Sequence, residues 1–391
     1  MRLELNAEER ELQAEVRDWL AANAPDPEEI PTHLDQRIPY LREWQARCYA
    51  QGYVGRSWPA EFGGGGRPPV EQIIVDQELA AAGAPEFPSV VGLDVLGPSL
   101  ITFGNDEQKR AHIEKILSAE EIWCQGFSEP EAGSDLASLR TKAVDDGDNF
   151  VISGQKTWIS WGQWASWCGV LCRTDESDRK HRGLSILIMD MSSPGVEVRP
   201  MTQITGHAEF AELFLDEVVV PKENLLGERG QGWPITLHTL GHERGTAALP
   251  RQVKMRTWLD WLLADAAARR VDGAALIDDK ATQVKLAQAQ IGVEVLRHHA
   301  YRTVGEFLNG GAVGEDSSTV KLLMAEAEQR LGETAIDVLG PTMFDGEDAH
   351  RKANEFWYET YLYSRAASVY GGTQQIQRGI IADRILQLPV K

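Results

Sequence analysis

The sequence predicts an α+β protein of three parts. An N-terminal α-helical domain is expected over residues 1–124, a middle antiparallel β domain (a barrel or a sandwich) over 125–228, and a C-terminal helical bundle over 229–391. Apolar residues recur at helical spacing in the two outer parts, which predicts amphipathic helices. Short β-branched and aromatic runs, separated by Gly, Asp and Pro, fill the middle part and predict strands. A chain of this length can hold two or three domains and a sizeable core.

The N-terminal part reads as helices. Leu12, Val16 and Leu20 recur at helical spacing, and Asn6 is a good cap for the first helix. The expected helices are residues 7–24, 34–50, 70–82 and 106–117. Four glycines, Gly63 to Gly66, follow the second helix, but no strand precedes them and no Lys-Ser/Thr follows. We therefore expect a flexible connector there rather than a phosphate loop.

The middle part alternates strand-like runs with turns. The expected strands include residues 150–153, 167–171, 184–189, 196–198 and 212–215. Helical periodicity then returns, and we expect helices over residues 234–268, 277–309, 318–339, 353–370 and 373–388. Long helices with short polar connections predict a bundle.

Charge and cysteine content exclude several classes of function. The chain carries 39 Lys and Arg against 59 Asp and Glu, a net charge of −20. This acidic balance argues against nucleic acid and anionic membrane as partners. The four cysteines form no CxxC pair and no cluster with metal-ligand spacing, so we expect a reduced, cytoplasmic protein without a metal site.

One stretch, residues 126–162, combines the features of a ligand site. It opens with a polar, glycine-broken loop, Ser128 to Asp135, and ends in a group of tryptophans. Hydroxyls and free backbone N–H groups beside flat aromatic faces suit a planar, hydrogen-bonding ligand.

This stretch closely resembles the flavin-binding signature of the acyl-CoA dehydrogenases. A second motif, Tyr370 to Arg378, resembles another signature of that family, and the resemblance covers nearly the whole chain. It implies FAD as cofactor and the α,β-dehydrogenation of an acyl-CoA thioester to the trans-2-enoyl-CoA, in fatty acid or lipid metabolism. Because no side chain accepts a hydride, the flavin takes it. An electron-transfer flavoprotein is the implied acceptor.

The resemblance also implies residues that bind the cofactor. Those at the flavin ring are Gln125, Phe127, Ser128, Ser134, Trp158 and Ser160. Thr373 and Gln375 match residues that contact the adenosine half of FAD across a subunit boundary. Without the resemblance, a Ser or Trp in a turn would be read as a cap or a packing residue.

The catalytic base is expected away from the second signature. Many members carry a glutamate directly after the tyrosine, but this chain has Gly371 there. A branch that resembles isovaleryl-CoA and long-chain acyl-CoA dehydrogenases places the base on a bundle helix, as a Glu before an Arg. Glu243 and Arg244 match that pair, so Glu243 is the expected base and bound substrate should raise its pKa. The alternative reading of Glu243 is an ordinary solvated carboxylate.

Gly371 is still expected to act in catalysis through its backbone. In the family the N–H at this position binds the thioester oxygen, which is an oxyanion-hole arrangement. The residues expected at the substrate are Ser134, Arg244, Tyr370 and Gly372.

Two motifs of the family are missing. The Arg-x-x-Phe-Gly motif, which reaches a neighbour's FAD, is absent from residues 268–276, and a Gly-Gly motif is replaced at 338–341. The expected assembly is therefore either a homotetramer or a heterotetramer with a second acyl-CoA dehydrogenase-like chain. Open alternatives are a non-catalytic or complementary subunit, or a relative that acts on a carrier-protein thioester or uses oxygen.

Overall fold

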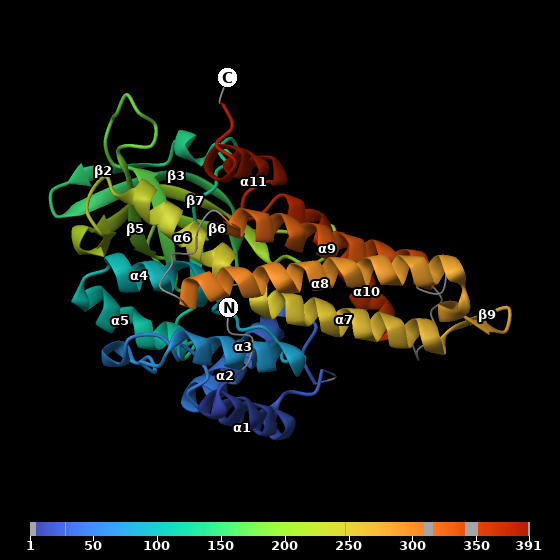
Figure 1. Cartoon of the computed structure of the whole chain (residues 1–391). Helices are drawn as coiled ribbons and strands as arrows, with labels where there is room; N and C mark the ends of the chain where they lie inside the picture. Colours follow the sequence, from blue (N-terminus) through green and yellow to red (C-terminus); the bar gives the residue numbers. More distant parts are fainter. Residues whose placement is uncertain (1–4, 28, 247, 309–315, 341–350, 390–391) are drawn as a thin grey trace. The chain divides into compact units, whose positions relative to one another are not determined.

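The computed structural model describes residues 5–27, 29–246, 248–308, 316–340 and 351–389. The chain divides into two compact units. Figure 1 shows the helices and strands that make them up. One comprises Met1–Ala22, Ile73–Ala84 and Arg244–Lys391, and the other comprises Asn23–Gln72 and Pro85–Glu243. Helices flank a β region in the chain order, so the predicted α+β class is confirmed. The proposed boundaries of the three domains stay a prediction.

The first unit is helical. Its elements are α1 (Ala7–Asn23), α3 (Pro69–Ala81), α7 (Ala248–Ala268), α8 (Lys280–Leu308), α9 (Asp316–Leu339), α10 (Arg351–Ser364), α11 (Gln374–Ile380) and a hairpin of β9 (Arg270–Val271) and β10 (Ala274–Ala275). The predicted cap of α1 is confirmed: Glu9 N–H donates to Asn6 Oδ1 at 2.8 Å, and Asn6 N–H donates to the Glu9 carboxylate. This reciprocal pair satisfies two donors that the first turn leaves free.

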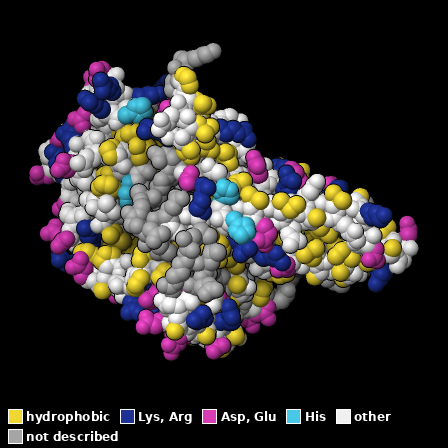
Figure 2. Space-filling view, in the orientation of Figure 1, with side chains coloured by type: hydrophobic (Ala, Val, Ile, Leu, Met, Phe, Trp, Pro, Cys, Tyr) yellow, Lys and Arg dark blue, Asp and Glu magenta, His cyan; other side chains and the backbone are white. Residues whose placement is uncertain are grey.

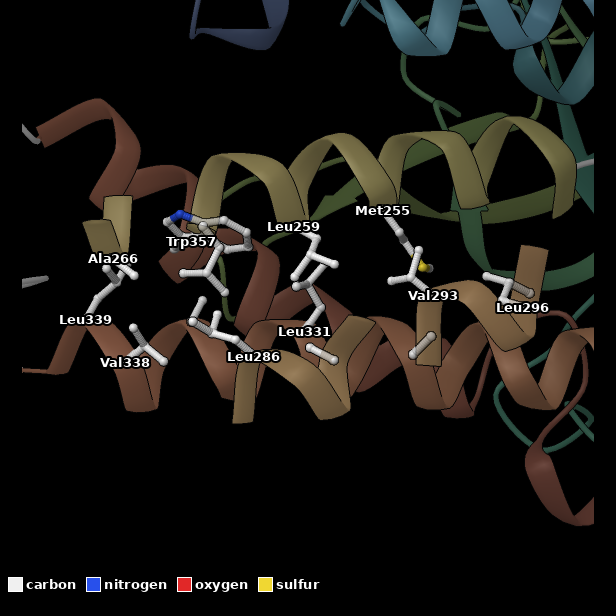
Figure 3. Close-up of a cluster of buried hydrophobic side chains, with 14 of the residues drawn as sticks. Met255, Leu259, Ala266, Leu286, Val293, Leu296, Leu331, Val338, Leu339 and Trp357 are labelled. Carbon is white, nitrogen blue, oxygen red and sulfur yellow. The ribbon is translucent and has the colours of Figure 1, made fainter. Parts of the chain in front are cut away.

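The core of the first unit lies between its long helices. Figure 3 shows Leu259 of α7, Val293 of α8, Leu331 of α9 and Trp357 of α10 turned toward one another. Each is almost completely buried. Burial of the large Trp357 ring stabilises this core, because removal of apolar area from water is favourable.

The second unit combines helices with the β domain. Its elements are α2 (Leu34–Ala50), α4 (Gly97–Phe103), α5 (Asp106–Leu117), β1 (Trp123–Gly126), β2 (Lys142–Asp146), β3 (Asn149–Ser160), β4 (Trp167–Arg173), β5 (Leu184–Asp190), β6 (Val196–Met201), β7 (Phe210–Pro221), β8 (Leu225–Leu226) and most of α6 (Gly232–Thr246). The sheet order is β6-β7-β3-β2-β4-β5-β8, and β1 pairs with β4. Most pairs are antiparallel as predicted, but β1 and β2 each run parallel to β4.

The helix expected over 234–268 is covered by α6 and α7 (Ala248–Ala268), and the one residue between them, 247, lies outside the described residues. Two other sequence-based expectations were wrong in detail. The helix expected over 353–370 ends at Ser364 and gives way to a 3-10 turn. The glycines Gly63–Gly66 are not a flexible connector: a Cβ on Gly64 would lie 2.4 Å from Trp58 O, so these glycines permit close backbone packing.

No helix within the described ranges is long and apolar enough to cross a membrane. The described residues also contain no group of three or more His, Cys, Asp or Glu side chains that would hold a metal ion.

Candidate functional site

The flavin-like signature begins at the end of β1. Gln125 lies on this strand, and its Nε2 is buried and has no hydrogen-bond partner among the described residues. A buried donor without a partner is rare in native structures and marks a place where a further group is expected. Phe127, two residues on, is buried, and Ser128 is half-buried.

The loop after β1 is closed by backbone hydrogen bonds. Glu129 N–H donates to Ala132 O at 3.1 Å, and Ala132 N–H donates to Glu129 O at 3.0 Å. Beyond this turn Ser134 is exposed. Asp135 follows it and accepts a hydrogen bond from Lys180 Nζ at 2.6 Å, which lowers the pKa of the Asp135 carboxyl.

Trp158 projects from a β-bulge in β3. Lys156 pairs with Leu213 of β7, whereas Ile159 pairs with Ala211, so β3 holds one extra residue at this point. The extra residue lets Lys156 and Ile159 both face the interior and leaves Trp158 59% exposed. Its φ is +60°, a strained value for a bulky side chain. Such outliers cluster at ligand sites.

A buried ion pair connects the loop after β1 with β3, both within the first signature. Lys156 is completely buried, and its Nζ lies 2.9 Å from Glu129 Oε1 and donates to Phe127 O at 3.0 Å. Glu129 also accepts the backbone N–H groups of Arg140 and Thr141. Burial acts to raise the pKa of Glu129, but the Lys156 charge and these hydrogen bonds outweigh it, so that pKa is lowered. Burial lowers the pKa of Lys156.

The side chains of these segments are of the kinds that a flavin ring binds. Across the part of the chain that the structure describes, the hydroxyls of Ser128, Ser134 and Ser160 have no hydrogen-bond partner. Together with Gln125 Nε2 and the exposed indole of Trp158, they offer hydrogen bonds and an aromatic face to a planar heterocycle. The sequence-predicted residues at the flavin ring therefore all lie on β1, on β3 or on the loop after β1.

The helix α6 carries Glu243 and Arg244. Its first part is fixed to α4: Ser99 Oγ lies 2.7 Å from Thr239 Oγ1 and 3.3 Å from His238 Nδ1, and the His238 ring packs edge-on against Phe103. Burial lowers the pKa of His238. Glu243 and Arg244 follow on the same helix, but their side chains lie outside the described residues, so their predicted roles stay predictions.

The second signature begins with a left-handed turn at Gly371 and Gly372, which leads into α11. Gly371 and Gly372 have φ values of +61° and +89°, which glycine adopts more easily than other residues. The buried Gln377 of α11 donates from Nε2 to Gly371 O at 2.9 Å and lies 3.4 Å from Gly372 O. The φ of +89° favours glycine at 372, and a Cβ there would also displace this Nε2, from which it would lie 2.4 Å.

Neighbouring side chains hold both ends of this turn. Lys321 of α9 is buried, donates to Ala367 O, and lies 4.8 Å from the centre of the Tyr370 ring. Thr373 caps α11, because its hydroxyl accepts the Ile376 N–H at 3.2 Å. Gln375, the second residue of α11, is exposed.

Of the two arginines in the segment that lacks the family motif, Arg269 is turned inward and Arg270 is exposed. Arg269 precedes β9 and is 6% exposed. Its guanidinium bonds Asn354 Oδ1 at 2.8 Å and Asp265 Oδ2 at 3.2 Å. The described part of the Val338–Pro341 segment ends at Gly340, so the second departure falls partly outside the described residues.

Sequence reasoning missed the residues that support these segments. Lys156 and Gln377 contact the backbone of the two signatures from inside. A lysine is expected at the surface. The sequence signal for Lys156 was its position on β3. It lies an even number of residues after the buried Phe150 and Ile152, so its side chain falls on the same face of the strand as theirs.

Known families cover the chain in three consecutive parts. Family models for the acyl-CoA dehydrogenase N-terminal, middle and C-terminal domains match residues 6–120, 124–218 and 230–386. "Acyl-CoA dehydrogenase IpdE1" of Mycobacterium tuberculosis (strain ATCC 25618 / H37Rv) is 39% identical over 391 aligned residues, which cover 97% of each chain.

Two solved structures give the same result. The "Tcur3481-Tcur3483 steroid ACAD" has a TM-score of 0.87 at 28% identity, and all of both chains is covered. The "ChsE4-ChsE5 complex" from Mycobacterium tuberculosis has a TM-score of 0.82 at 29% identity, again with full coverage of both chains. Matching family models along the chain, and a relative of this identity over nearly its full length, show that the chain belongs to the acyl-CoA dehydrogenase family and is an acyl-CoA dehydrogenase.

Proposed function

We propose that this protein catalyses the FAD-dependent α,β-dehydrogenation of an acyl-CoA thioester to the trans-2-enoyl-CoA. The observation that carries the proposal is the flavin signature: a strained, exposed Trp158 on β3 and the free hydroxyls of Ser128 and Ser160. When bound, the flavin supplies the acceptor for the β-hydride. Gln125, Phe127, Ser128, Ser134, Trp158 and Ser160 would hold the ring, and Thr373 and Gln375 the adenosine half.

Glu243 is the proposed base. It takes the proton from the α-carbon of the thioester while the β-hydride leaves, so that a carbon–carbon double bond forms between them. Two sequence facts support it. Gly371 has no side chain at the position where many relatives carry the base, and the Glu243-Arg244 pair stands on α6 where the other branch carries it. Arg244 is proposed to help hold the substrate.

The peptide N–H of Gly371 is the proposed donor to the thioester oxygen. Negative charge develops on this oxygen when the α-proton leaves, and a fixed N–H stabilises it. The hydrogen bonds from Gln377 to the two glycine carbonyls support this role, because they fix the turn that carries the N–H. Ser134, Tyr370 and Gly372 are proposed to line the substrate.

The protein is proposed to function in an assembly, as a homotetramer or as a heterotetramer with a second acyl-CoA dehydrogenase-like chain. Hydrophobic side chains lie between charged ones along α7 and α8 (Figure 2), and Val284, Ile291 and Val295 of α8 are each more than a third exposed. A strip of this kind is typical of a contact surface. An electron-transfer flavoprotein is the proposed acceptor of the electrons.

A second candidate function is that of a complementary subunit. The segment 268–276 lacks the Arg-x-x-Phe-Gly motif. Of its two arginines, Arg269 is held inside its own unit by Asn354 and Asp265, and the exposed Arg270 is not followed by Phe-Gly. A chain without this motif needs a different chain to complete the FAD site. Two of the similar solved structures are each named after two chains, which supports this second candidate.

The test is anaerobic reduction of the purified protein by a panel of acyl-CoA thioesters. The panel holds straight-chain, branched and steroid-side-chain acyl groups, the last because one relative is named a steroid enzyme. We expect a yellow protein whose visible absorption bleaches with one class, and a product two hydrogens lighter by mass spectrometry. A yellow protein that no thioester bleaches would contradict the dehydrogenase proposal and favour the complementary subunit.

A further inference from the structure

We propose that Lys156 is a positioning residue that ties together the two flavin-facing segments of the β domain. The inference rests on the proposed function, since it assigns the buried ammonium a role in holding the flavin site. Lys156 itself does not face the site, because its side chain is completely buried.

The hydrogen bonds that the Lys156 side chain donates within the described residues go to the loop after β1. Its Nζ donates to Phe127 O at 3.0 Å and to Glu129 Oε1 at 2.9 Å, and these two residues flank Ser128. The next residue of β3 contributes a third bond, from Thr157 N–H to Ser128 O at 2.9 Å. Phe127, Ser128 and Glu129 are therefore each bonded to β3 by a separate hydrogen bond.

The same lysine stands at the start of the β-bulge that exposes Trp158. Lys156 is the last residue of β3 in register with β7 before the extra residue. Its burial fixes which face the strand turns inward at this point, and so fixes the outward direction of Trp158. One side chain thus sets both the loop that carries the Ser128 hydroxyl and the strand that carries the indole.

A buried ion pair stabilises a protein interior less well than apolar side chains that fill the same volume. Replacing a buried ion pair by apolar residues of similar volume is often neutral or stabilising, so stability alone does not account for this pair. The pair does fix the position of the β1–β2 connection. The Lys156 ammonium donates to Phe127 O, and the Glu129 carboxylate accepts the N–H groups of Arg140 and Thr141. A ligand site that is held loosely by its supporting residues loses affinity and rate.

The test uses two double variants of the full chain. Lys156→Met alone would leave Glu129 buried without its counter-charge and would fold poorly, so Glu129→Gln is added to each. Lys156→Met with Glu129→Gln removes the donor, whereas Lys156→Gln with Glu129→Gln keeps an uncharged donor. Lys222→Met is the matched control, because Lys222 pairs with Asp145 at the surface of the same domain.

Two quantities are measured in each folded variant: the Kd for FAD, and the hydrogen-exchange rates of the amides at 127–132 against those of β4 and β5. We expect the Met double variant to raise the Kd about tenfold or more and to speed exchange only at 127–132, on the scale that a loosened site produces. The absorption bands of its bound flavin should also shift. The Gln double variant should recover part of both losses, and Lys222→Met should change neither.

A folded Met double variant with the parent's Kd and the parent's exchange would overturn the positioning role. So would equal losses in the two double variants, because a merely structural role does not distinguish them. A parent protein that binds no FAD, alone or with a partner chain, would refute the proposed function itself and this role with it. Altered exchange at 127–132 together with normal FAD binding would instead leave the proposed function standing and reject the positioning role alone.

Discussion

Three residues of the candidate site have uncommon backbone conformations. Trp158, Gly371 and Gly372 all have positive φ values, and all lie in the two motifs that the sequence singled out. The residue types in those motifs were readable from the sequence. The strain at Trp158 was not, because it follows from a bulge in the pairing of β3 with β7 that no local pattern specifies.

The strain at Trp158 predicts an unusual order of stabilities. Trp158→Gly should be more resistant to urea than Trp158→Ala by about 1 kcal/mol, because only glycine adopts a φ of +60° without a steric cost. Both variants should bind FAD more weakly than the parent. Urea unfolding of the two variants measures the difference, and an alanine variant at least as stable as the glycine variant would show that the backbone relaxes.

Gly372 should not tolerate a methyl group. Gly372→Ala places a Cβ 2.4 Å from Gln377 Nε2 at a φ of +89°, so we expect a loss of about 1–2 kcal/mol in the free energy of unfolding and a fall in dehydrogenase rate. The control is Gly379→Ala in α11, where no atom lies within 4 Å of the added Cβ. That change should be neutral or stabilising by up to about 1 kcal/mol. Equal effects of the two changes on stability and rate would argue against a special turn.

At the scale of elements, the sequence predicted types better than ends. The capped helices α1 and α5 were placed within a residue of their observed ends, because Asn6 and Asn105 each form a capping box. The end of α10 at Ser364 was missed. The parallel pairing of β1 with β4 was also missed, because pairing between distant strands leaves no local signal.

The attachment of α6 to α4 predicts a pH dependence. Burial lowers the pKa of His238 below its usual 6.5, so the folded state binds the proton less tightly than the unfolded state does. Stability is therefore unaffected above about pH 6.5 and falls as the pH drops through that value toward the lowered pKa. His238→Gln should flatten this decline. Urea midpoints between pH 8 and pH 5.5 measure it, and identical curves for parent and variant would exclude His238 as the cause.

At the scale of the whole molecule, composition and motif order predicted the class and the family. The α+β class was correct, and the family models fall along the chain in the predicted order. The supporting residues Lys156 and Gln377 were not predictable as such, because their roles depend on burial and on contacts made only after folding. The sequence does not identify the acyl group, because the shape of a binding pocket depends on residues that are far apart in the chain.

The missing Arg-x-x-Phe-Gly motif and the buried Arg269 predict that full FAD binding requires a second, complementary chain. If this chain alone cannot complete a neighbour's FAD site, it should bind less than one FAD per chain when purified alone. Co-expression with a complementary chain should raise the flavin content, as measured by absorbance and light scattering on the same sample. Full flavin content in a homotetramer of this chain would contradict that expectation and leave Arg269 as an internal structural residue.

The most direct test of the account is the rate of anaerobic flavin bleaching in Glu243→Gln, measured with the acyl-CoA class that bleaches the parent. The matched control is Glu228→Gln, an exposed carboxylate shortly before the same helix. We expect Glu243→Gln to keep its FAD and its affinity for the thioester and to bleach at least about a hundredfold more slowly, as loss of a general base requires. The control should bleach at the parent rate. A yellow Glu243→Gln protein that bleaches as fast as the parent would contradict the assignment of the base.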